Sequence, residues 1–185
     1  MNNEAGFFIR LSFLKHTMSS AQQNLSTVKD LPNGEGLRFS IVVSEWNEEI
    51  TGSLYDACHQ TLLAAGCKQE DIIRTNVPGS FELPLGAKRA LDSARFDGVI
   101  CLGCVIQGET RHFDFICDAV ANGIMRLNLD HKIPVIFGVL TPENMQQAID
   151  RAGGKHGNKG VEAAMTALKM ARMDGDRKRV AGFSS

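Results

Sequence analysis

The chain has 185 residues, of which 43% are hydrophobic and 22% are charged. This length fits one domain with extensions, and the composition excludes a wholly disordered chain and a large multidomain assembly. Twenty lysines and arginines stand against 21 aspartates and glutamates, so the net charge of −1 gives no global basic field that would recruit nucleic acid or an anionic membrane. Any site for an anion must therefore be local.

Three regions follow one another along the chain. Residues 1–36 are predicted to form a flexible N-terminal extension, because their apolar stretch is interrupted by Arg10 and lacks a small-residue cleavage site. Residues 37–174 have a regular pattern and are predicted to form the single domain. Residues 175–185 include three consecutive basic residues and are predicted to be a polar C-terminal tail.

From residue 37 onward, short β-rich apolar runs alternate with segments of helical periodicity. In chain order, the predicted elements are a strand at 39–44, a helix at 48–66, a strand at 72–77, a helix at 81–94, a strand at 98–106, a helix at 110–129, a strand at 134–140, and helices at 143–152 and 160–173. This alternation predicts an α/β fold with a parallel sheet covered by helices on both faces. Fully apolar strands agree, because a parallel sheet is buried on both sides.

The five cysteines lie in apolar surroundings, and their odd number predicts buried thiols in a reducing compartment, the cytoplasm. Cys101 and Cys104 form a C-x-x-C pattern inside the predicted strand at 98–106. Residues three apart on a strand point to opposite faces, so the pattern predicts neither redox chemistry nor a metal site.

The candidates for a ligand site follow the predicted strands, because open α/β sheets bind ligands beyond the carboxyl ends of their strands. The first strand is followed by Trp46 and Asn47, the second by residues 78–82, and the third by residues 107–112. This set suits a planar heterocycle beside a phosphate group. Trp46, the only tryptophan, would face solvent at this place unless a ligand or a partner covers it.

The turn before the third helix is the candidate anion site. Gly108 lets the backbone approach a ligand closely, and the following amides are unpaired donors at a helix start. Thr110 can cap the helix or bind a phosphate oxygen, and Glu109 would contribute its amide rather than its carboxylate. His112 lies in the first turn, where the positive end of the helix dipole disfavours imidazolium. A neutral ring can accept a proton, so His112 is the predicted catalytic residue.

Residues 151–160 carry glycines and cations that suit either a phosphate site or a solvated basic turn, and their spacing alone does not decide between the two. They do not form a P-loop.

Five segments together resemble the lumazine synthase family, and the similarity covers residues 39–173: these are residues 43–47, 77–84, 103–114, 134–142 and 151–160. The resemblance implies a flavodoxin-like three-layer α/β/α fold with a four-stranded parallel sheet and no cofactor or metal. It also implies the penultimate step of riboflavin synthesis. There, 5-amino-6-(D-ribitylamino)uracil and 3,4-dihydroxy-2-butanone 4-phosphate condense to 6,7-dimethyl-8-ribityllumazine, and phosphate and water are released.

Position by position, the resemblance implies that His112 is the acid/base and that the Trp46 ring stacks on the pyrimidine. The other implied contacts to the pyrimidine and its ribityl chain are Asn47, Ser80, Phe81, Glu82, Cys104, Val105, Ile106 and Phe137. The implied phosphate contacts are Gly108, Glu109, Thr110, Arg151 and Lys159. In this arrangement Phe137, Arg151 and Lys159 come from a neighbouring subunit. The departures from the family pattern are Cys104, Gln107 and Arg111, which stand where a threonine, a basic residue and a small residue are common.

The resemblance further implies a homopentamer with active sites at subunit interfaces, and a possible association with riboflavin synthase. The compact turn at residues 153–160 favours a hollow icosahedral shell of twelve pentamers. Neither nucleic acid nor membrane is an expected partner. Two alternatives stay open: a cage-forming relative that binds riboflavin with weak or no synthase activity, and a non-catalytic flavin carrier. The carboxylates at residues 44–49 disfavour the carrier, because they would repel its phosphate.

Overall fold

A four-stranded parallel sheet, in the strand order β2-β1-β3-β4, forms the centre of the molecule. The computed structural model describes residues 31–93 and 96–181, with side chains up to residue 173. The strands are β1 (Phe39–Ser44), β2 (Ile72–Val77), β3 (Gly98–Cys104) and β4 (Val135–Leu140). The helices are α1 (Glu48–Ala64), α2 (Leu83–Ser93), α3 (His112–Asp130), α4 (Met145–Arg151) and α5 (Lys159–Ala181). Two short 3-10 helices, η2 (Gln69–Asp71) and η3 (Ser80–Glu82), and a hairpin of β5 (Ala152–Gly154) and β6 (Gly157–Asn158) complete the fold.

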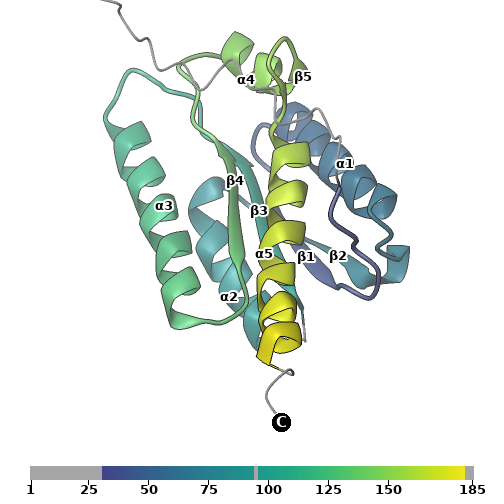
Figure 1. The fold of residues 1–185 in the computed structure, drawn as a ribbon. Coiled ribbons are helices and arrows are strands. Elements are labelled where there is room, and N and C mark those ends of the chain that lie inside the picture. The colour runs from purple at the N-terminus through teal and green to yellow at the C-terminus, as the bar shows by residue number, and fades with distance from the viewer. Residues whose placement is uncertain (1–30, 94–95, 182–185) are drawn as a thin grey trace, which may run out of the picture.

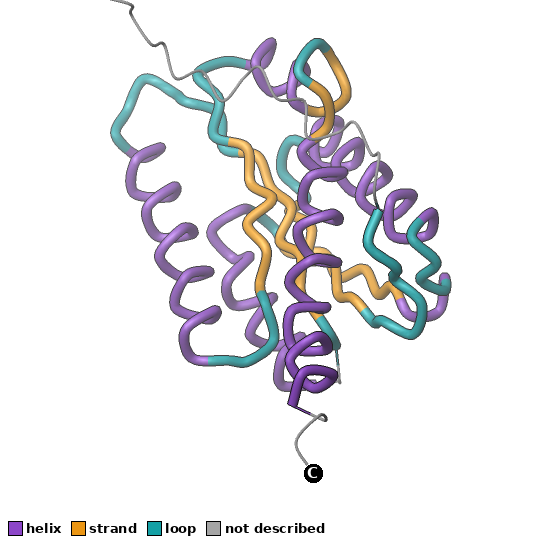
Figure 2. Tube along the Cα trace, viewed as in Figure 1, coloured by secondary structure: helices purple, strands orange, loops and turns teal. Residues whose placement is uncertain are grey.

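Helices cover both faces of the sheet, so the predicted three-layer α/β/α architecture is confirmed (Figures 1 and 2). On one face, α1 and α5 pack on the sheet through Leu54 and Leu168, which are fully buried. On the other face, α2 and α3 contribute Leu83 and Ile124 to a second core. Apolar residues at three- and four-residue spacing give each helix one buried stripe, which is why the sequence pattern located these helices within a few residues.

The two cysteines of the C-x-x-C pattern lie on opposite faces of the sheet, as predicted. Cys101 belongs to the core under α2 and α3, whereas Cys104 belongs to the core under α1 and α5. Burial raises the pKa of the Cys101 thiol to about 12 and that of Cys104 to about 11. Both are therefore protonated at neutral pH, and all five cysteines are free. Among the described residues, no cluster of side chains is suited to hold a metal ion.

The prediction of fully apolar strands is wrong for β2. This strand has the sequence IIRTNV, and its four inner residues are exposed because the helices leave this edge strand largely uncovered. Arg74 of β2 instead lies over the ring of Tyr55, with its guanidinium carbon 4.3 Å from the ring centroid. Over the described residues, the structure has no helix that is both long and apolar enough to cross a membrane.

Both ends of the fold extend beyond the boundaries expected from the sequence. The Gly34 amide donates a hydrogen bond of 2.7 Å to the Ala65 carbonyl, and Arg172 of α5 donates to the carbonyls of Asn33 and Glu35. The packed structure thus includes the last residues of the predicted N-terminal extension, whose first 30 residues lie outside the described part. At the other end, α5 continues to Ala181, so the predicted C-terminal tail begins as helix.

Gly160 allows α5 to cross α1 closely, because a Cβ at this position would collide with the backbone carbonyl oxygen of Leu54. We expect Gly160→Ala to lower the free energy of unfolding by about 1–3 kcal/mol. Gly52, in the second turn of α1, has open space where its Cβ would lie. Gly52→Ala should therefore raise the free energy of unfolding by about 0.5–1 kcal/mol, and this variant serves as the matched control. Thermal denaturation of both variants checks the crossing, and a wild-type melting temperature for Gly160→Ala would contradict it.

Candidate active site

The segments that follow β1, β2 and β3 lie at one edge of the sheet. β1 pairs in parallel with both β2 and β3, so Val43 is in register with Asn76 on one side and with Leu102 on the other. Parallel strands end at the same edge, and the structure therefore brings Trp46, η3 and the loop leading to His112 to a common rim. This is the placement that the sequence predicted.

The Trp46 side chain is exposed, while its backbone is fixed by a hydrogen bond. Its amide donates to the Pro78 carbonyl at 3.2 Å, which ties the end of β1 to the segment after β2. Its indole lies against Gly79, where a Cβ would be only 3.1 Å from the Trp46 Cε3 atom. Trp46 is nevertheless 69% exposed. The ring thus offers a broad apolar surface to a planar ligand, which is the exposure that its position after a strand predicted.

Asn47 fixes the distance between the ends of β1 and β3. Its Nδ2 donates a hydrogen bond of 3.0 Å to the Cys104 carbonyl. Its backbone has φ 59° and ψ 47°, a left-handed conformation that asparagine tolerates better than most residues. Its own carbonyl accepts from the amides of Ile50 and Thr51, which starts α1. Asn47 therefore positions the rim as well as lying on it.

The three predicted contact residues of η3 differ in accessibility. Phe81 is exposed, and Glu82 is half-buried, with its Oε2 accepting a hydrogen bond of 3.0 Å from the Gly79 amide. Ser80 is buried, and its Oγ has no hydrogen-bond partner. This hydroxyl lies so close to β3 that a Cβ at Gly103 would be 2.6 Å from it. Phe81 and Glu82 are therefore the residues of η3 that reach the surface.

The loop after β3 carries the predicted anion turn and is anchored to the loop after β4. The amide of Gln107 donates to the Pro142 carbonyl at 2.9 Å. Gln107, Gly108 and Glu109 line an open cleft together with Glu143, whose carboxylate the sequence reasoning did not consider. Two carboxylates at this cleft mean that an anion would have to be met by backbone amides.

His112 is the first residue of α3 and is exposed. Its amide lies 3.4 Å from the Thr110 Oγ1, which accepts a hydrogen bond from it. Arg111 pairs with Asp114 at 3.6 Å and lies over the Phe115 ring, so its charge runs along the outer side of α3. The unusual arginine is thus directed toward its own helix rather than toward Gly108.

Arg151 and Lys159 form a separate group beyond the end of β4. Arg151 ends α4, Lys159 begins α5, and the β5–β6 hairpin between them brings their side chains to one carboxylate, that of Glu162. Glu162 Oε1 lies 2.8 Å from Arg151 Nη2, and Glu162 Oε2 lies 3.1 Å from Lys159 Nζ. The sequence reasoning did not identify Glu162, although a glutamate three residues after a lysine in a first helical turn is a usable signal.

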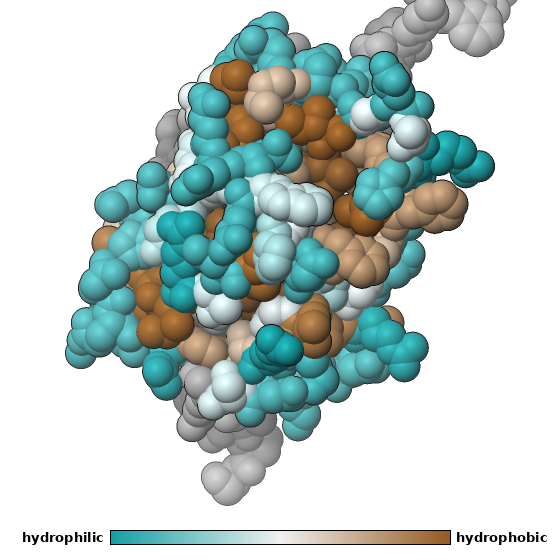
Figure 3. Space-filling model, turned by 180° about the vertical axis from the view of Figure 1, so that it is seen from behind, coloured by the Kyte–Doolittle hydropathy of each residue, from teal (hydrophilic) through white to brown (hydrophobic). Residues whose placement is uncertain are grey.

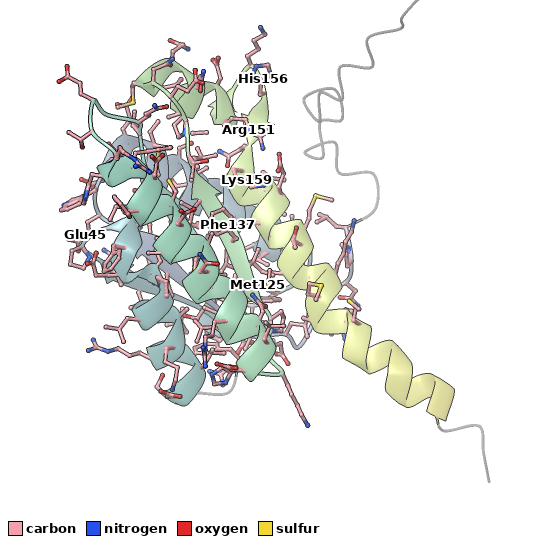
Figure 4. The ribbon with its side chains drawn as sticks, turned by 90° about the vertical axis from the view of Figure 1, so that its left-hand side faces the viewer. Glu45, Met125, Phe137, Arg151, His156 and Lys159 are labelled. Atoms are coloured by element: carbon pink, nitrogen blue, oxygen red, sulfur yellow. The ribbon has the colours of Figure 1, made fainter. Side chains whose placement is uncertain are left out.

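Two clefts surround this second group. Arg151 and Lys159 line a cleft of about 240 Å³ beyond the end of β4, together with Thr141 and Gln147. Lys159 and Phe137 also line a cleft of about 570 Å³ that runs along β4 between α3 and α5. Figure 4 shows Glu45, the neighbour of Trp46, on the side of α2 and α3, and Arg151 and Lys159 at the start of α5 on the other side. Within the described residues, no hydrogen bond or ion pair joins Arg151 or Lys159 to Trp46 or His112.

Apolar side chains are exposed around the larger cleft. Met125 of α3 and Met170 of α5 line it, and Phe137 of β4 is 38% exposed there. Further hydrophobic patches are visible on the opposite face of the molecule, where they are separated by hydrophilic side chains (Figure 3). An apolar surface beside a group of predicted site residues is typical of a face that another subunit covers.

Substitution of Asn47 tests its role at the rim. Asn47→Ala removes the bond to Cys104 and places alanine in a left-handed conformation that it adopts less readily than asparagine does, so we expect the free energy of unfolding to fall by about 1–3 kcal/mol. Asn47→Gly loses the same bond but adopts this backbone freely, and its cost should be smaller. Melting temperatures at equal protein concentration compare the two, and a larger loss for the glycine variant would contradict the backbone argument.

Comparison with known proteins adds an independent observation. A model of the 6,7-dimethyl-8-ribityllumazine synthase family matches residues 36–174. A protein of that name from Cytophaga hutchinsonii is 62% identical over 154 residues, which are 83% of this chain and 97% of that protein. The corresponding protein of Flavobacterium johnsoniae is 54% identical over 156 residues, 83% of this chain and 82% of that protein. That of Parabacteroides distasonis is 50% identical over 155 residues, 83% of this chain and 97% of that protein. The matched residues include both groups of predicted site residues.

Proposed function

Because the chain belongs to the 6,7-dimethyl-8-ribityllumazine synthase family, we propose that it catalyses the penultimate step of riboflavin biosynthesis. The reaction condenses 5-amino-6-(D-ribitylamino)uracil with 3,4-dihydroxy-2-butanone 4-phosphate and yields 6,7-dimethyl-8-ribityllumazine, phosphate and water. The observation that supports the proposal is the common rim: Trp46 and His112 follow neighbouring parallel strands, so a ring stacked on the indole would lie at the same edge of the sheet as the imidazole.

The pyrimidine binds against Trp46 in this proposal. The exposed indole and the exposed Phe81 ring provide apolar surface for a heterocycle, and Glu82 and Asn47 provide polar groups beside it. The ribityl chain and the ring edge extend along the end of β3 and the residues that follow it, namely Cys104, Val105 and Ile106. Ser80 supports this segment from below, since its hydroxyl is buried.

The phosphate binds where two contributions meet. The first is the turn at Gly108, Glu109 and Thr110, whose amides precede a helix of 19 residues with its positive end toward the turn. The second is the pair of Arg151 and Lys159, supplied by a neighbouring subunit. This division is supported by the carboxylates of Glu109 and Glu143 beside the turn and by the placement of Arg151 and Lys159 in a different cleft.

The chemistry requires proton transfers at a fixed place. The 5-amino group of the pyrimidine attacks the ketone, and the resulting carbinolamine loses water to give an imine. Loss of a proton from the adjacent carbon then expels phosphate, and the ribitylamino nitrogen closes the second ring with loss of another water. His112 accepts and returns the protons in these steps. Because every step is an addition, an elimination or a proton transfer, the proposed reaction needs neither cofactor nor metal.

The active form in this proposal is an oligomer. The cleft of about 570 Å³ along β4 is largely apolar and is bordered by Phe137, which the pyrimidine site takes from the adjoining subunit. We propose a homopentamer with five shared sites and a shell of twelve pentamers, with riboflavin synthase as an associated protein. The five free thiols suit a reducing compartment, and we propose the cytoplasm.

The decisive experiment incubates the purified protein with both substrates and follows lumazine absorbance. We expect His112→Ala to reduce kcat by about 10²-fold or more, with activity that is slow rather than absent, because substrate orientation is kept. His131→Ala, at the far end of α3, is the matched control and should retain wild-type activity. Riboflavin binding without lumazine formation by the wild type would favour the binding relative or the flavin carrier instead.

Trp46→Ala tests the stacking surface. We expect the KM for the pyrimidine to rise by about tenfold, because stacking of a base on an aromatic ring is worth about 1–3 kcal/mol. Trp46→Phe keeps a smaller ring and should lie between the alanine variant and the wild type. Steady-state kinetics with the phosphorylated substrate held constant measures the effect. An unchanged KM in Trp46→Ala would contradict the assignment.

A further inference from the structure

Glu162 connects the two cations that the proposed function assigns to the phosphate. Each of its carboxylate oxygens contacts a different one, at 2.8 Å for Arg151 and 3.1 Å for Lys159. The Glu162 side chain is only 9% exposed, whereas those of Arg151 and Lys159 are 34% and 30% exposed. The carboxylate thus lies beneath its two partners, and the cations lie between it and the solvent.

Arg151 is held at two points. Its Nη2 contacts Glu162, and its Nη1 donates a hydrogen bond of 2.7 Å to the His156 carbonyl in the β5–β6 hairpin. A guanidinium has five N–H donors, so these two bonds fix its plane and leave donors for an anion. Lys159 has only Glu162 as an ion-pair partner among the described residues. The orientation of both cations therefore depends on one side chain.

The charge at this place is strongly positive without Glu162. Arg151 and Lys159 carry two positive charges, and the amino-terminal end of α5, a helix of 23 residues, adds the positive end of its dipole. Glu162 lies in the first turn of α5 and lowers the sum of the three side-chain charges to +1. Glu162 therefore lowers the positive charge that a doubly charged phosphate would meet at this place.

We propose that Glu162 is a positioning residue that sets the phosphate affinity of the Arg151–Lys159 pair. It holds both cations in place and offsets one of their charges, so that the phosphate ester binds and inorganic phosphate is released. The inference rests on the proposed function for its role in turnover. The effect on inorganic phosphate binding, however, can be measured without any turnover.

The test measures binding of inorganic phosphate to the full-length protein by calorimetry at low ionic strength. Glu162→Gln removes the charge with little change in shape, and we expect phosphate to bind about three- to tenfold more tightly, as one opposing charge at a partly exposed site predicts. In turnover, this variant should be inhibited by phosphate at lower concentrations and should have a lower kcat. Equal or weaker phosphate binding by Glu162→Gln would overturn the proposal.

Three comparisons separate charge from shape and from folding. Glu162→Asp keeps the charge, so its phosphate affinity should stay within about twofold of the wild type; affinity as high as that of Glu162→Gln would also overturn the proposal. Lys159→Gln combined with Glu162→Gln restores the sum of the side-chain charges to +1 and should return the phosphate affinity toward the wild type. This double variant can be measured even if Glu162→Gln alone fails to fold. Glu70→Gln, on the exposed η2, controls for general loss of one negative charge and should bind phosphate as the wild type does.

The outcomes also distinguish this inference from the function on which it rests. A wild-type protein that forms no lumazine but shows the expected order of phosphate affinities would overturn the synthase function and leave the role of Glu162 intact. A wild-type protein that forms lumazine, together with a Glu162→Gln variant whose phosphate affinity is unchanged, would overturn the role of Glu162 and leave the synthase function intact.

Discussion

Parallel pairing of β1 with both β2 and β3 is the constraint on which the site depends. It places three chain segments that are far apart in sequence at one edge, and the Asn47 side chain then ties the first to the third through the Cys104 carbonyl. The left-handed backbone of Asn47 turns the chain from β1 into α1 and leaves Trp46 at the outside of the turn. Exposure of the indole therefore follows from the sheet and not from loose packing.

Positive and negative groups lie side by side at the predicted phosphate contacts, and the chain as a whole is also nearly neutral, with a net charge of −1. The amides after Gly108 lie beside the carboxylates of Glu109 and Glu143, and the cations at the start of α5 are offset by Glu162. Under the proposed function, each half of the phosphate site is thus a weak anion site by itself. Strong attraction arises only where the two halves meet, and this links substrate binding to assembly.

The sequence predicted the sheet, the helices and the rim because each depends on a local signal: apolar periodicity for the elements and the parallel topology for the rim. It failed where the outcome depends on tertiary position. The polar residues of β2 are tolerated because the helices leave this edge strand largely uncovered, and Glu162 meets Arg151 because the β5–β6 hairpin reverses the chain between them. The family resemblance supplied the roles of Phe137, Arg151 and Lys159, which spacing alone left open.

β4 is an edge strand of the sheet, and this position bears on the oligomer that we propose. Phe137 lies on this strand and borders a cleft between α3 and α5, and Arg151 and Lys159 line a second cleft beyond its end. These residues therefore flank one side of the sheet edge, two strands away from the end of β1 that leads to Trp46. Under the proposed function, a second chain packs its rim against the edge of β4 of the first chain. This contact would bury the apolar cleft of the first chain and bring Arg151 and Lys159 of the first chain to the rim of the second. In the proposed enzyme, stability of the oligomer and completeness of the active site therefore have one physical origin.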